Sequence, residues 1–434
     1  MSVNTNSYKS TVNEMTTKQF GPGWYVSLSR KEQRTVKACV GGWALDAMDV
    51  QLYSFVIPAL MALWHLSKTE ASFLQSVVLA MSSLGGLLAG WLADRIGRVR
   101  TMQITIAWFA VFSFLSGLAQ NYQQLLGCRA LMGLGFGGEW AAGAVLLGET
   151  IRAQHRGKAL GSMQAGYAVG WAMALFFNWL IFAYLTLPED ISWRMMFFVG
   201  VTPAVLVFFL RRFIEEPEVY QRSKAEIAAG EKSGSIVDIF RPPLLRITVL
   251  GGLLGAGAQG GWQAVMVLMP LYLKTERHLT VSGSSGSILV MIVGSFCGYM
   301  AGAYLSDMVG RRNTFLIFAI GSFITVLVYT IAPFPESARL IIGAPLGFFS
   351  SGVFSAQGAF LTEQFPTKVR GVGQGFTYNL GRVIGAFTPV AVALLSESMM
   401  SLGTAIGVVA GFAYALMAFA AFMLPETRGK VLEP

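Results

Sequence analysis

Long apolar runs separated by polar connections dominate the pattern along this chain of 434 residues. A membrane-spanning α-helix needs about 20 consecutive, predominantly apolar residues. Twelve segments meet that requirement, and the connection over 213–243 is the one long, charged stretch between them. The pattern predicts spanning helices over 36–60, 71–93, 102–120, 124–147, 157–183, 194–212, 244–273, 283–305, 313–333, 337–361, 371–396 and 402–424.

The long connection divides the predicted helices into six plus six. The sequence therefore predicts an all-α polytopic membrane protein with an N-terminal tail over 1–35, one half over 36–212, a central loop over 213–243, a second half over 244–424 and a C-terminal tail over 425–434. The first thirty-odd residues lack the apolar core of a cleavable signal peptide. We expect them to form a flexible cytoplasmic tail.

The composition agrees with this interpretation. Hydrophobic residues make up 54% of the chain and charged residues only 13%, whereas a soluble domain carries roughly 25% charge. The apolar excess excludes a disordered chain. The net charge of +9 is explained better by basic cytoplasmic loops than by nucleic-acid binding, so we expect no nucleic-acid partner.

The basic residues predict the orientation in the membrane. Of the 32 Lys and Arg residues, 25 fall in the tails, the central loop and the connections on one side, and five fall on the other side. The side with the excess is the cytoplasmic one. We therefore expect an integral plasma-membrane protein, in a bacterial inner membrane, with both termini in the cytoplasm. The last two basic residues, Arg129 and Arg382, lie within predicted helices.

The two halves share repeated motifs. Asp94-Arg95-Ile96-Gly97-Arg98 recurs 213 residues later as Asp307-Met308-Val309-Gly310-Arg311. Glu149, Arg156 and Gly157 recur 214 residues later as Glu363, Arg370 and Gly371. Two equivalent six-helix halves place the binding site of a transporter between them, near the middle of the membrane.

Gly90-x3-Asp94-Arg95-x-Gly97-Arg98-x-Arg100 resembles the signature loop of the major facilitator superfamily. Arg129-Ala-Leu-Met-Gly133-Leu-Gly135-Phe-Gly137-Gly138-Glu139-Trp140 is similar to the sialate:proton symporter group, and Asp46-x-x-Asp49 and Gly381-Arg382 are similar to the aromatic acid:proton symporters. The resemblance implies the major facilitator fold and proton symport of a carboxylate. In the second half Met308 replaces the Arg of the loop, and Ala303 stands in the place of Gly90, so this half of the gate is expected to be looser.

The signature loop and its repeat are the expected cytoplasmic gate. Charges of opposite sign at the ends of neighbouring helices can hold one side of a transporter closed and separate when that side opens. The residues concerned are Gly90, Asp94, Arg95, Gly97, Arg98, Glu149, Arg156, Asp307, Arg311, Glu363 and Arg370.

Five ionisable residues lie inside predicted helices: Asp46, Asp49, Arg129, Glu139 and Arg382. Placing a charged group inside a membrane costs free energy, so such residues usually have a structural or functional role. Asp46 and Asp49 share one helix face, where mutual repulsion and poor solvation favour proton binding by at least one of them. Both are candidate proton carriers, Asp49 also for substrate contact. The alternative is that one Asp is only a structural acceptor for neighbouring backbone or for an Arg.

Arg129 and Glu139 are ten residues apart on one predicted helix, about 15 Å at 1.5 Å per residue, too far for a direct pair. We expect Arg129 to be an intramembrane charge toward the outer face. Glu139 is either a further proton carrier or a structural partner of a neighbouring helix. The glycines between them are expected to permit close helix packing.

Arg382 lies near the midpoint of its predicted helix, where a guanidinium can hold a substrate carboxylate through two parallel hydrogen bonds. The alternative is a permanent salt bridge to Asp46 or Asp49. Polar groups among aromatic ones describe a small-molecule cavity. The further candidate substrate-binding residues are Gln164, Tyr167, Gln259, Gln263, Tyr378 and Asn379.

These observations favour a secondary transporter that imports an organic anion (a small carboxylate, an aromatic acid or a sugar acid) by proton symport. The alternatives are a facilitator of a neutral sugar or polyol, which would not need five intramembrane charges, and a membrane receptor, which would need a signalling domain. No enzymatic motif, cofactor motif or metal-ligand pattern is present in the sequence. The expected partners are a carboxylate substrate, protons and membrane lipid, and the expected functional unit is a monomer.

Overall fold

The computed structural model describes residues 23–185, 187–211, 236–366 and 369–427, and the ordered elements within these ranges are helical. Some side chains inside these ranges are outside what the structure describes. Among the expected functional residues these are Asp94, Arg98, Glu139, Glu149, Arg156 and Asp307. Their predicted roles therefore stay predictions.

The helices of the first half are α2 (Gly23–Val26), α3 (Arg30–Trp64), α4 (Lys68–Ile96), α5 (Arg98–Leu118), α6 (Tyr122–Thr150), α7 (Ala153–Asn178), its π-helical continuation η1 (Trp179–Tyr184) and α8 (Glu189–Arg211). The second half contains η2 (Ile236–Phe240), α10 (Leu244–Met266), α11 (Met269–Thr275), α12 (Val281–Val309), α13 (Arg311–Thr330), α14 (Glu336–Gln364), α15 (Arg370–Ala386), α16 (Thr388–Ser398) and α17 (Leu402–Met423). Each of the twelve predicted segments coincides with one helix or with two consecutive helical pieces. Nine helices in the described part of the chain are long and apolar enough to cross a membrane.

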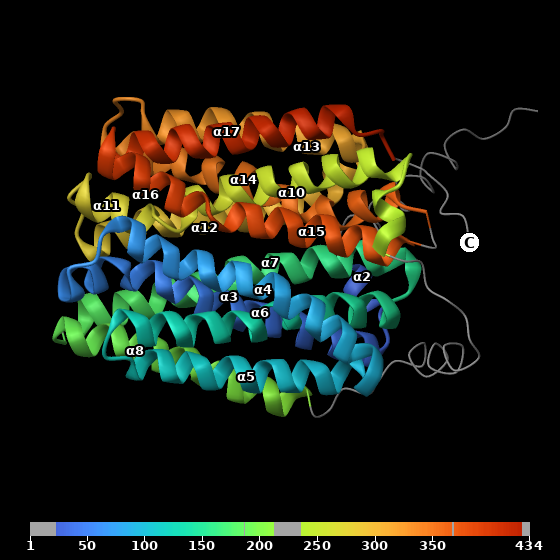
Figure 1. Ribbon diagram of the computed structural model, residues 1–434, viewed down its shortest axis with the longest axis horizontal. Helices are drawn as coiled ribbons and strands as arrows, with labels where there is room; N and C mark the ends of the chain where they lie inside the picture. The colour runs from blue at the N-terminus through green and yellow to red at the C-terminus, as the bar shows by residue number, and fades with distance from the viewer. Residues whose placement is uncertain (1–22, 186, 212–235, 367–368, 428–434) are drawn as a thin grey trace, which may run out of the picture.

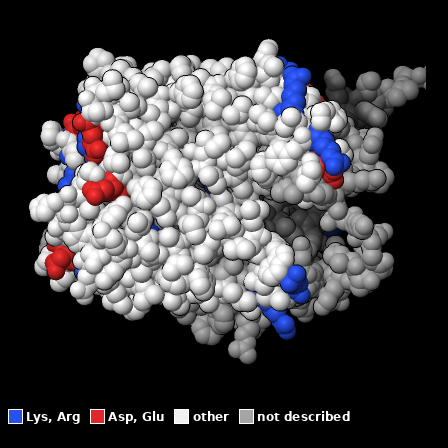
Figure 2. Space-filling view, viewed as in Figure 1, with Lys and Arg blue, Asp and Glu red and all other residues white. Residues whose placement is uncertain are grey.

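The two halves are bundles that lie side by side, with most helices along the long axis of the molecule (Figure 1). They meet where α7 packs against α12 and where α4 packs against α15 and α16. On the face shown in Figure 2, charged side chains gather at the two ends and leave a broad central band almost without charge. This distribution is typical of helices whose middle portions face lipid.

Two of the predicted spans are each broken into two helices. The span over 244–273 becomes α10 and α11, and the span over 371–396 becomes α15 and α16. Each second piece carries a proline in its first turn, Pro270 and Pro389, and proline lacks the amide hydrogen that a continuous helix requires. The second break is anchored because the Thr388 hydroxyl donates to the Gly260 carbonyl of α10 at 2.8 Å.

The glycines of α6 are sites of close helix approach, as the sequence predicted. A Cβ atom on Gly137 would overlap the Ser82 carbonyl oxygen of α4, and one on Gly135 would lie 2.8 Å from the Thr105 carbonyl oxygen of α5. Only glycine therefore allows the backbone of α6 to approach both neighbours. This packing fixes the depth and rotation of α6.

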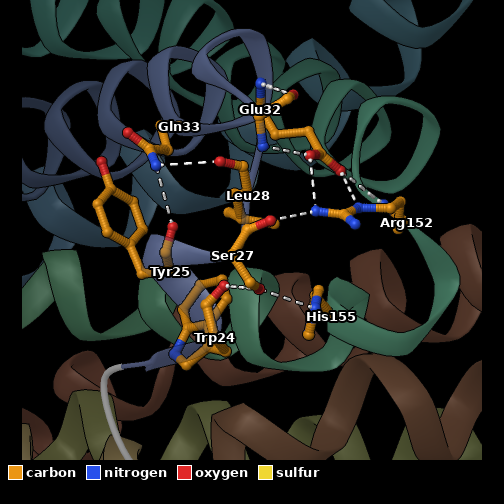
Figure 3. A network of polar contacts seen from close by, with 9 residues as sticks. Trp24, Tyr25, Ser27, Leu28, Glu32, Gln33, Arg152 and His155 are labelled. Atoms are coloured by element: carbon orange, nitrogen blue, oxygen red, sulfur yellow. Dashed lines mark hydrogen bonds and ion pairs between the residues drawn. The ribbon is translucent and has the colours of Figure 1, made fainter.

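Within the tail expected over 1–35, the described residues form the short helix α2 and, from Arg30, the first turns of α3. Helix α3 begins at Arg30 because Ser29 and Glu32 form a reciprocal capping box, a motif that satisfies two of the free amide groups of the first turn. Glu32 also accepts hydrogen bonds from Arg152, whose Nη2 donates to the Ser27 carbonyl at 2.6 Å (Figure 3). These contacts tie the segment before α3 to the connection between α6 and α7.

Candidate functional site

A cavity that is partly open to solvent lies between the two halves, with about 440 Å³ of empty space when its open part is counted. Four helices of each half contribute to its wall, so the cavity is at the place that the internal repeat predicts. The lining residues are Trp43, Leu79, Phe136, Gln164 and Tyr167 from the first half and Gln259, Trp262, Gln263, Tyr299, Phe354, Tyr378 and Arg382 from the second half.

Six of the eight candidate substrate-binding residues are brought together in this wall: Gln164, Tyr167, Gln259, Gln263, Tyr378 and Arg382. The other two, Asp49 and Asn379, are not among the described lining residues. The Asn379 amide donates to the Gly375 carbonyl of its own helix at 2.9 Å. A Cβ on Gly86 would lie 3.7 Å from Asn379 Oδ1, so this side chain faces α4.

Several aromatic residues of the wall were not singled out from the sequence, Trp43, Phe136 and Tyr299 among them. In a chain this rich in aromatic residues, helical spacing alone does not separate a cavity aromatic from a packing one. Phe136 gave no signal of its own, because sharing a helix face with Arg129, two turns earlier, does not place a ring in the cavity.

Arg382 is the cation of the cavity and is only 6% exposed. Its guanidinium carbon lies 5.0 Å from the centre of the Phe136 ring and 5.9 Å from that of Tyr378. No carboxylate among the described side chains forms an ion pair with it. Aromatic faces compensate a buried cation only in part, so this guanidinium can accept an anionic ligand.

The aromatic rings of the wall form a continuous series across both halves. Phe136 is stacked on Trp43 at 5.8 Å, and Trp43 lies 5.7 Å from Tyr167. Tyr167 in turn meets the edge of Trp262 at 5.4 Å. Since Arg382 and Trp262 belong to the second half, two contacts of this series bridge the halves.

Asp49 and Arg129 form a second charged site, enclosed within the first half. Both side chains are fully buried, and Arg129 Nη1 lies 3.9 Å from Asp49 Oδ2. Asp49 also accepts a hydrogen bond from the Ser113 hydroxyl. Arg129 donates to Gln75 Oε1 at 3.2 Å, and its guanidinium lies 4.7 Å from the centre of the Tyr53 ring.

This pair bears on one part of an alternative left open by the sequence, a salt bridge from Arg382 to Asp49. The ion-pair partner of Asp49 is Arg129, and no pair between Asp49 and Arg382 exists. Asp46 is also buried, with 5% of its surface exposed. The third candidate proton carrier, Glu139, has its side chain outside the described part of the structure.

The repeated loops have the same backbone geometry. Gly97 and Gly310 adopt positive φ angles of 104° and 97°, a region that favours glycine. In the second half Arg311 binds Glu363 through two hydrogen bonds of 3.2 Å, and the Thr427 hydroxyl donates to the same carboxylate at 2.5 Å.

Other described residues of the expected gate make different contacts. Arg95 stacks on Trp91 at 4.0 Å, and Arg370 donates to the Phe365 carbonyl at 3.4 Å. A Cβ on Gly90 would meet no described atom within 4 Å, so close packing does not explain this glycine. The structure thus forms one ion pair of the gate among the described side chains, Arg311–Glu363.

The halves are also joined at the end of the bundle opposite to α2. The Thr69 amide in the first turn of α4 donates to Glu397 Oε1 at 3.0 Å, and the Thr69 hydroxyl donates to Oε2 at 2.7 Å. Lys68 Nζ donates to the Ser396 hydroxyl at 3.4 Å. A carboxylate of α16 thereby caps a helix of the other half, where the positive end of the helix dipole favours it.

Comparisons with known proteins agree with this architecture. The sequence profile of the Major Facilitator Superfamily matches residues 40–389. The "Probable 4-methylmuconolactone transporter" of Cupriavidus pinatubonensis is 40% identical over 410 residues, which cover 94% of each chain. The "Cis,cis-muconate transport protein" of Acinetobacter baylyi is 30% identical over 85% of this chain and 88% of that protein.

A solved structure supports the fold independently. The crystal structure of a D-xylose-proton symporter superimposes with a TM-score of 0.75 and covers 92% of this chain and 99% of its own. Its sequence is 19% identical, so this likeness concerns the fold alone.

Proposed function

Since this chain belongs to the Major Facilitator Superfamily and is a transporter rather than an enzyme, we propose that it imports a small organic anion by proton symport with alternating access. The observation that carries the proposal is Arg382, a buried guanidinium in the wall of the cavity between the halves. A carboxylate can bind a guanidinium through two parallel hydrogen bonds and neutralise it.

The lining of the cavity favours a planar or ring-shaped acid. The rings of Phe136, Tyr167 and Trp262 offer flat apolar surfaces beside the cation. The names of two relatives, a muconolactone transporter and a muconate transport protein, support an unsaturated organic acid as the substrate.

Asp49 is the proposed proton carrier. Its carboxylate is fully buried and held by Ser113 and Arg129, and a proton on Asp49 would release Arg129 from that pair. We propose that the proton binds while the site faces outward and leaves on the side of higher pH. Asp46 and Glu139, the other candidates from the sequence, serve as alternatives in the test.

Alternating access requires the contacts between the halves to separate in turn. The Thr69–Glu397 contact at one end is proposed to close the outer side. The gate residues of the repeated loops are proposed to close the cytoplasmic side. The stacking of Arg382 on Phe136 joins the two halves inside the cavity. A substrate bound to Arg382 would therefore lie at the boundary where the two halves move relative to each other.

The proposed setting is a bacterial inner membrane with both termini in the cytoplasm and a monomer as the functional unit. The excess of basic residues in the tails and loops supports this orientation. The first described helix, α2, and the end of α17 lie at the same end of the bundle (Figure 1), as an even number of spans requires.

The first experiment is a thermal-shift screen of purified protein with carboxylates and neutral sugars. A ligand that binds the native state raises the melting temperature. We expect carboxylates to raise it in the wild type and to fail in Arg382→Ala. Stabilisation by a neutral sugar, unchanged in Arg382→Ala, would favour the facilitator and contradict the proposal.

Proton coupling is tested in proteoliposomes with the ligand found in that screen. Asp49→Asn is a permanent mimic of the protonated carboxyl, so we expect it to abolish accumulation driven by a pH gradient while exchange survives in part. Asp46→Asn is the matched control one turn away and should have a milder effect. Accumulation that persists in Asp49→Asn and is lost only in Glu139→Gln would move the proton carrier to α6.

A further inference from the structure

Two polar atoms of the cavity wall have no hydrogen-bond partner within the described structure. They are the amide oxygen Oε1 of Gln263 and the indole Nε1 of Trp43. Each side chain is 4% exposed, and both line the cavity. A buried polar group without a partner costs free energy that a bound molecule can recover.

Two other polar groups of the wall are in a different situation. The Trp262 indole donates to the Ser351 hydroxyl at 3.2 Å, and the Tyr167 hydroxyl donates to Gln51 Oε1 at 3.4 Å. These bonds hold both rings in place without a ligand. Gln263 Oε1 and Trp43 Nε1, in contrast, have hydrogen-bonding capacity left for the contents of the cavity.

Water satisfies such groups before a ligand enters. A ligand that displaces this water without replacing its hydrogen bonds loses affinity, and a ligand that replaces them does not. A site built to hydrogen-bond a hydroxyl consequently rejects the analogue that lacks it. The two atoms of the wall thus discriminate between acids that are otherwise alike.

We propose that the transported acid carries, besides its carboxylate, a hydroxyl group that Gln263 recognises, with the Trp43 indole as a second contact to oxygen. The inference rests on the proposed function, in which Arg382 holds the carboxylate. A hydroxyl donates to an amide oxygen and accepts from an indole N–H. It would also accept from the amide nitrogen if the Gln263 amide were rotated by half a turn.

The test measures dissociation constants by titration calorimetry for sets of acids that differ at one position. The sets are benzoate with its hydroxy and fluoro derivatives, 3-phenylpropanoate with the same ring substitutions, and butanoate with 3-hydroxybutanoate. Fluorine is close to a hydroxyl in size but has no hydrogen to donate. We expect at least one hydroxylated acid to bind the wild type about tenfold more tightly than its parent.

The variant Gln263→Met keeps the length of the side chain and removes the amide. We expect the preference for the hydroxylated acid over its parent to fall to about twofold or less. The melting temperature of the variant, compared with that of the wild type, shows whether the variant is folded. A preference that survives in Gln263→Met would overturn the role of this residue.

Gln357→Leu is the matched control, because Gln357 is a buried amide of α14 with both polar atoms unpartnered but is not among the described lining residues. It should leave the hydroxyl preference intact. Trp43→Phe removes the N–H and keeps a ring, and it should reduce the preference by a few fold.

The failures of the two proposals are distinguishable. Carboxylates that bind in an Arg382-dependent manner without any gain from a hydroxyl would contradict only the present inference. A preference for fluorinated over hydroxylated acids would contradict it as well, since it would show an apolar contact at that position. If no acid of any set binds the wild type, the proposed function fails and this inference fails with it.

Discussion

Arg129 and Arg382 are both buried arginines inside the helical bundle, yet their surroundings differ in kind. Arg129 has a carboxylate at 3.9 Å, an amide oxygen at 3.2 Å and an aromatic ring face, all from its own half. Arg382 has aromatic ring faces on both sides of the boundary between the halves, and no ion-pair partner among the described side chains.

The difference teaches where this fold compensates a buried charge within the protein and where it leaves that charge open to a ligand. A buried ion must be compensated, because transfer out of water costs several kcal/mol per ion. Asp49 and its neighbours compensate Arg129 within the protein. Ring faces compensate Arg382 in part, and we propose that an anion entering the cavity completes the compensation.

The largest expected effect tests the open side of this comparison. Arg382→Ala should abolish uptake and weaken carboxylate binding by about 30-fold or more, because it removes the charge that a buried anion needs. Arg382→Lys keeps the charge but loses the planar pair of donors, so we expect severe impairment. Calorimetric binding of the ligand identified by thermal shift is the measurement. Near-normal affinity in Arg382→Ala would remove this residue from the site.

The closed side of the comparison predicts an effect on stability. Arg129→Leu leaves the Asp49 carboxylate buried without its cation, and breaking a buried pair in this way costs about 3–5 kcal/mol. The double variant Arg129→Leu with Asp49→Asn should recover much of this loss. Denaturant unfolding in detergent micelles measures both. The comparison would break if Arg382→Leu destabilised the protein as strongly as Arg129→Leu does.

Much of the fold could be predicted from the sequence, because hydropathy over some 20 residues is a strong and local signal. The twelve segments and the two halves follow from it directly. The breaks at Pro270 and Pro389 and the early start of α3 were also readable from local motifs, a proline in each case and the capping box of Ser29 and Glu32. Hydropathy missed them because a break within an apolar run leaves the run apolar, and a helix that begins in a polar segment has no apolar signal at its start.

The candidate site could be predicted only in part. The residues of the cavity wall were found where a polar residue interrupts an apolar helix, as at Gln164, Gln259 and Gln263. The Asp49–Arg129 pair could not be found, since spacing within one helix does not reveal which two helices are neighbours. The same limit applies to Phe136, whose role depends on an arginine 246 residues later in the chain.

The Arg311–Glu363 ion pair at the edge of the bundle adds a partly buried pair to the comparison of the two buried arginines. Arg311 and Glu363 are each 16% exposed, so water compensates part of their charge. Glu363→Gln removes the ion pair and weakens the bond from Thr427, and we expect a loss of about 1–2 kcal/mol in unfolding free energy. Cysteine accessibility at this end of the bundle should also increase. Unchanged accessibility with a normal melting temperature would contradict a role in the gate.

The smallest expected effect concerns His155, near the start of α7. This residue extends the comparison to an ionisable group at the water-exposed end of the bundle. The Ser27 hydroxyl donates to the Trp24 carbonyl at 2.6 Å, so its oxygen accepts from His155 Nε2 at 3.3 Å (Figure 3). Burial lowers the pKa of His155, the cations Arg152 and Lys158 lower it further, and Glu32 opposes them. The packing of His155 beside Ser27 therefore favours the neutral imidazole ring.

The sign of the resulting pH dependence follows from linkage. The pKa of His155 is lowered while residues 23–35 pack against the start of α7, so His155 binds protons more readily when this packing opens. The packing is therefore most stable above the ordinary histidine pKa of about 6.5 and weakens as the pH falls below it. Hydrogen exchange of residues 23–35, corrected for the intrinsic rate, should show faster opening at pH 5.5 than at pH 7.5. His155→Gln should remove most of this difference, because a glutamine amide can still donate to Ser27 but does not titrate. The same pH dependence in the variant would contradict this assignment and show that another group titrates.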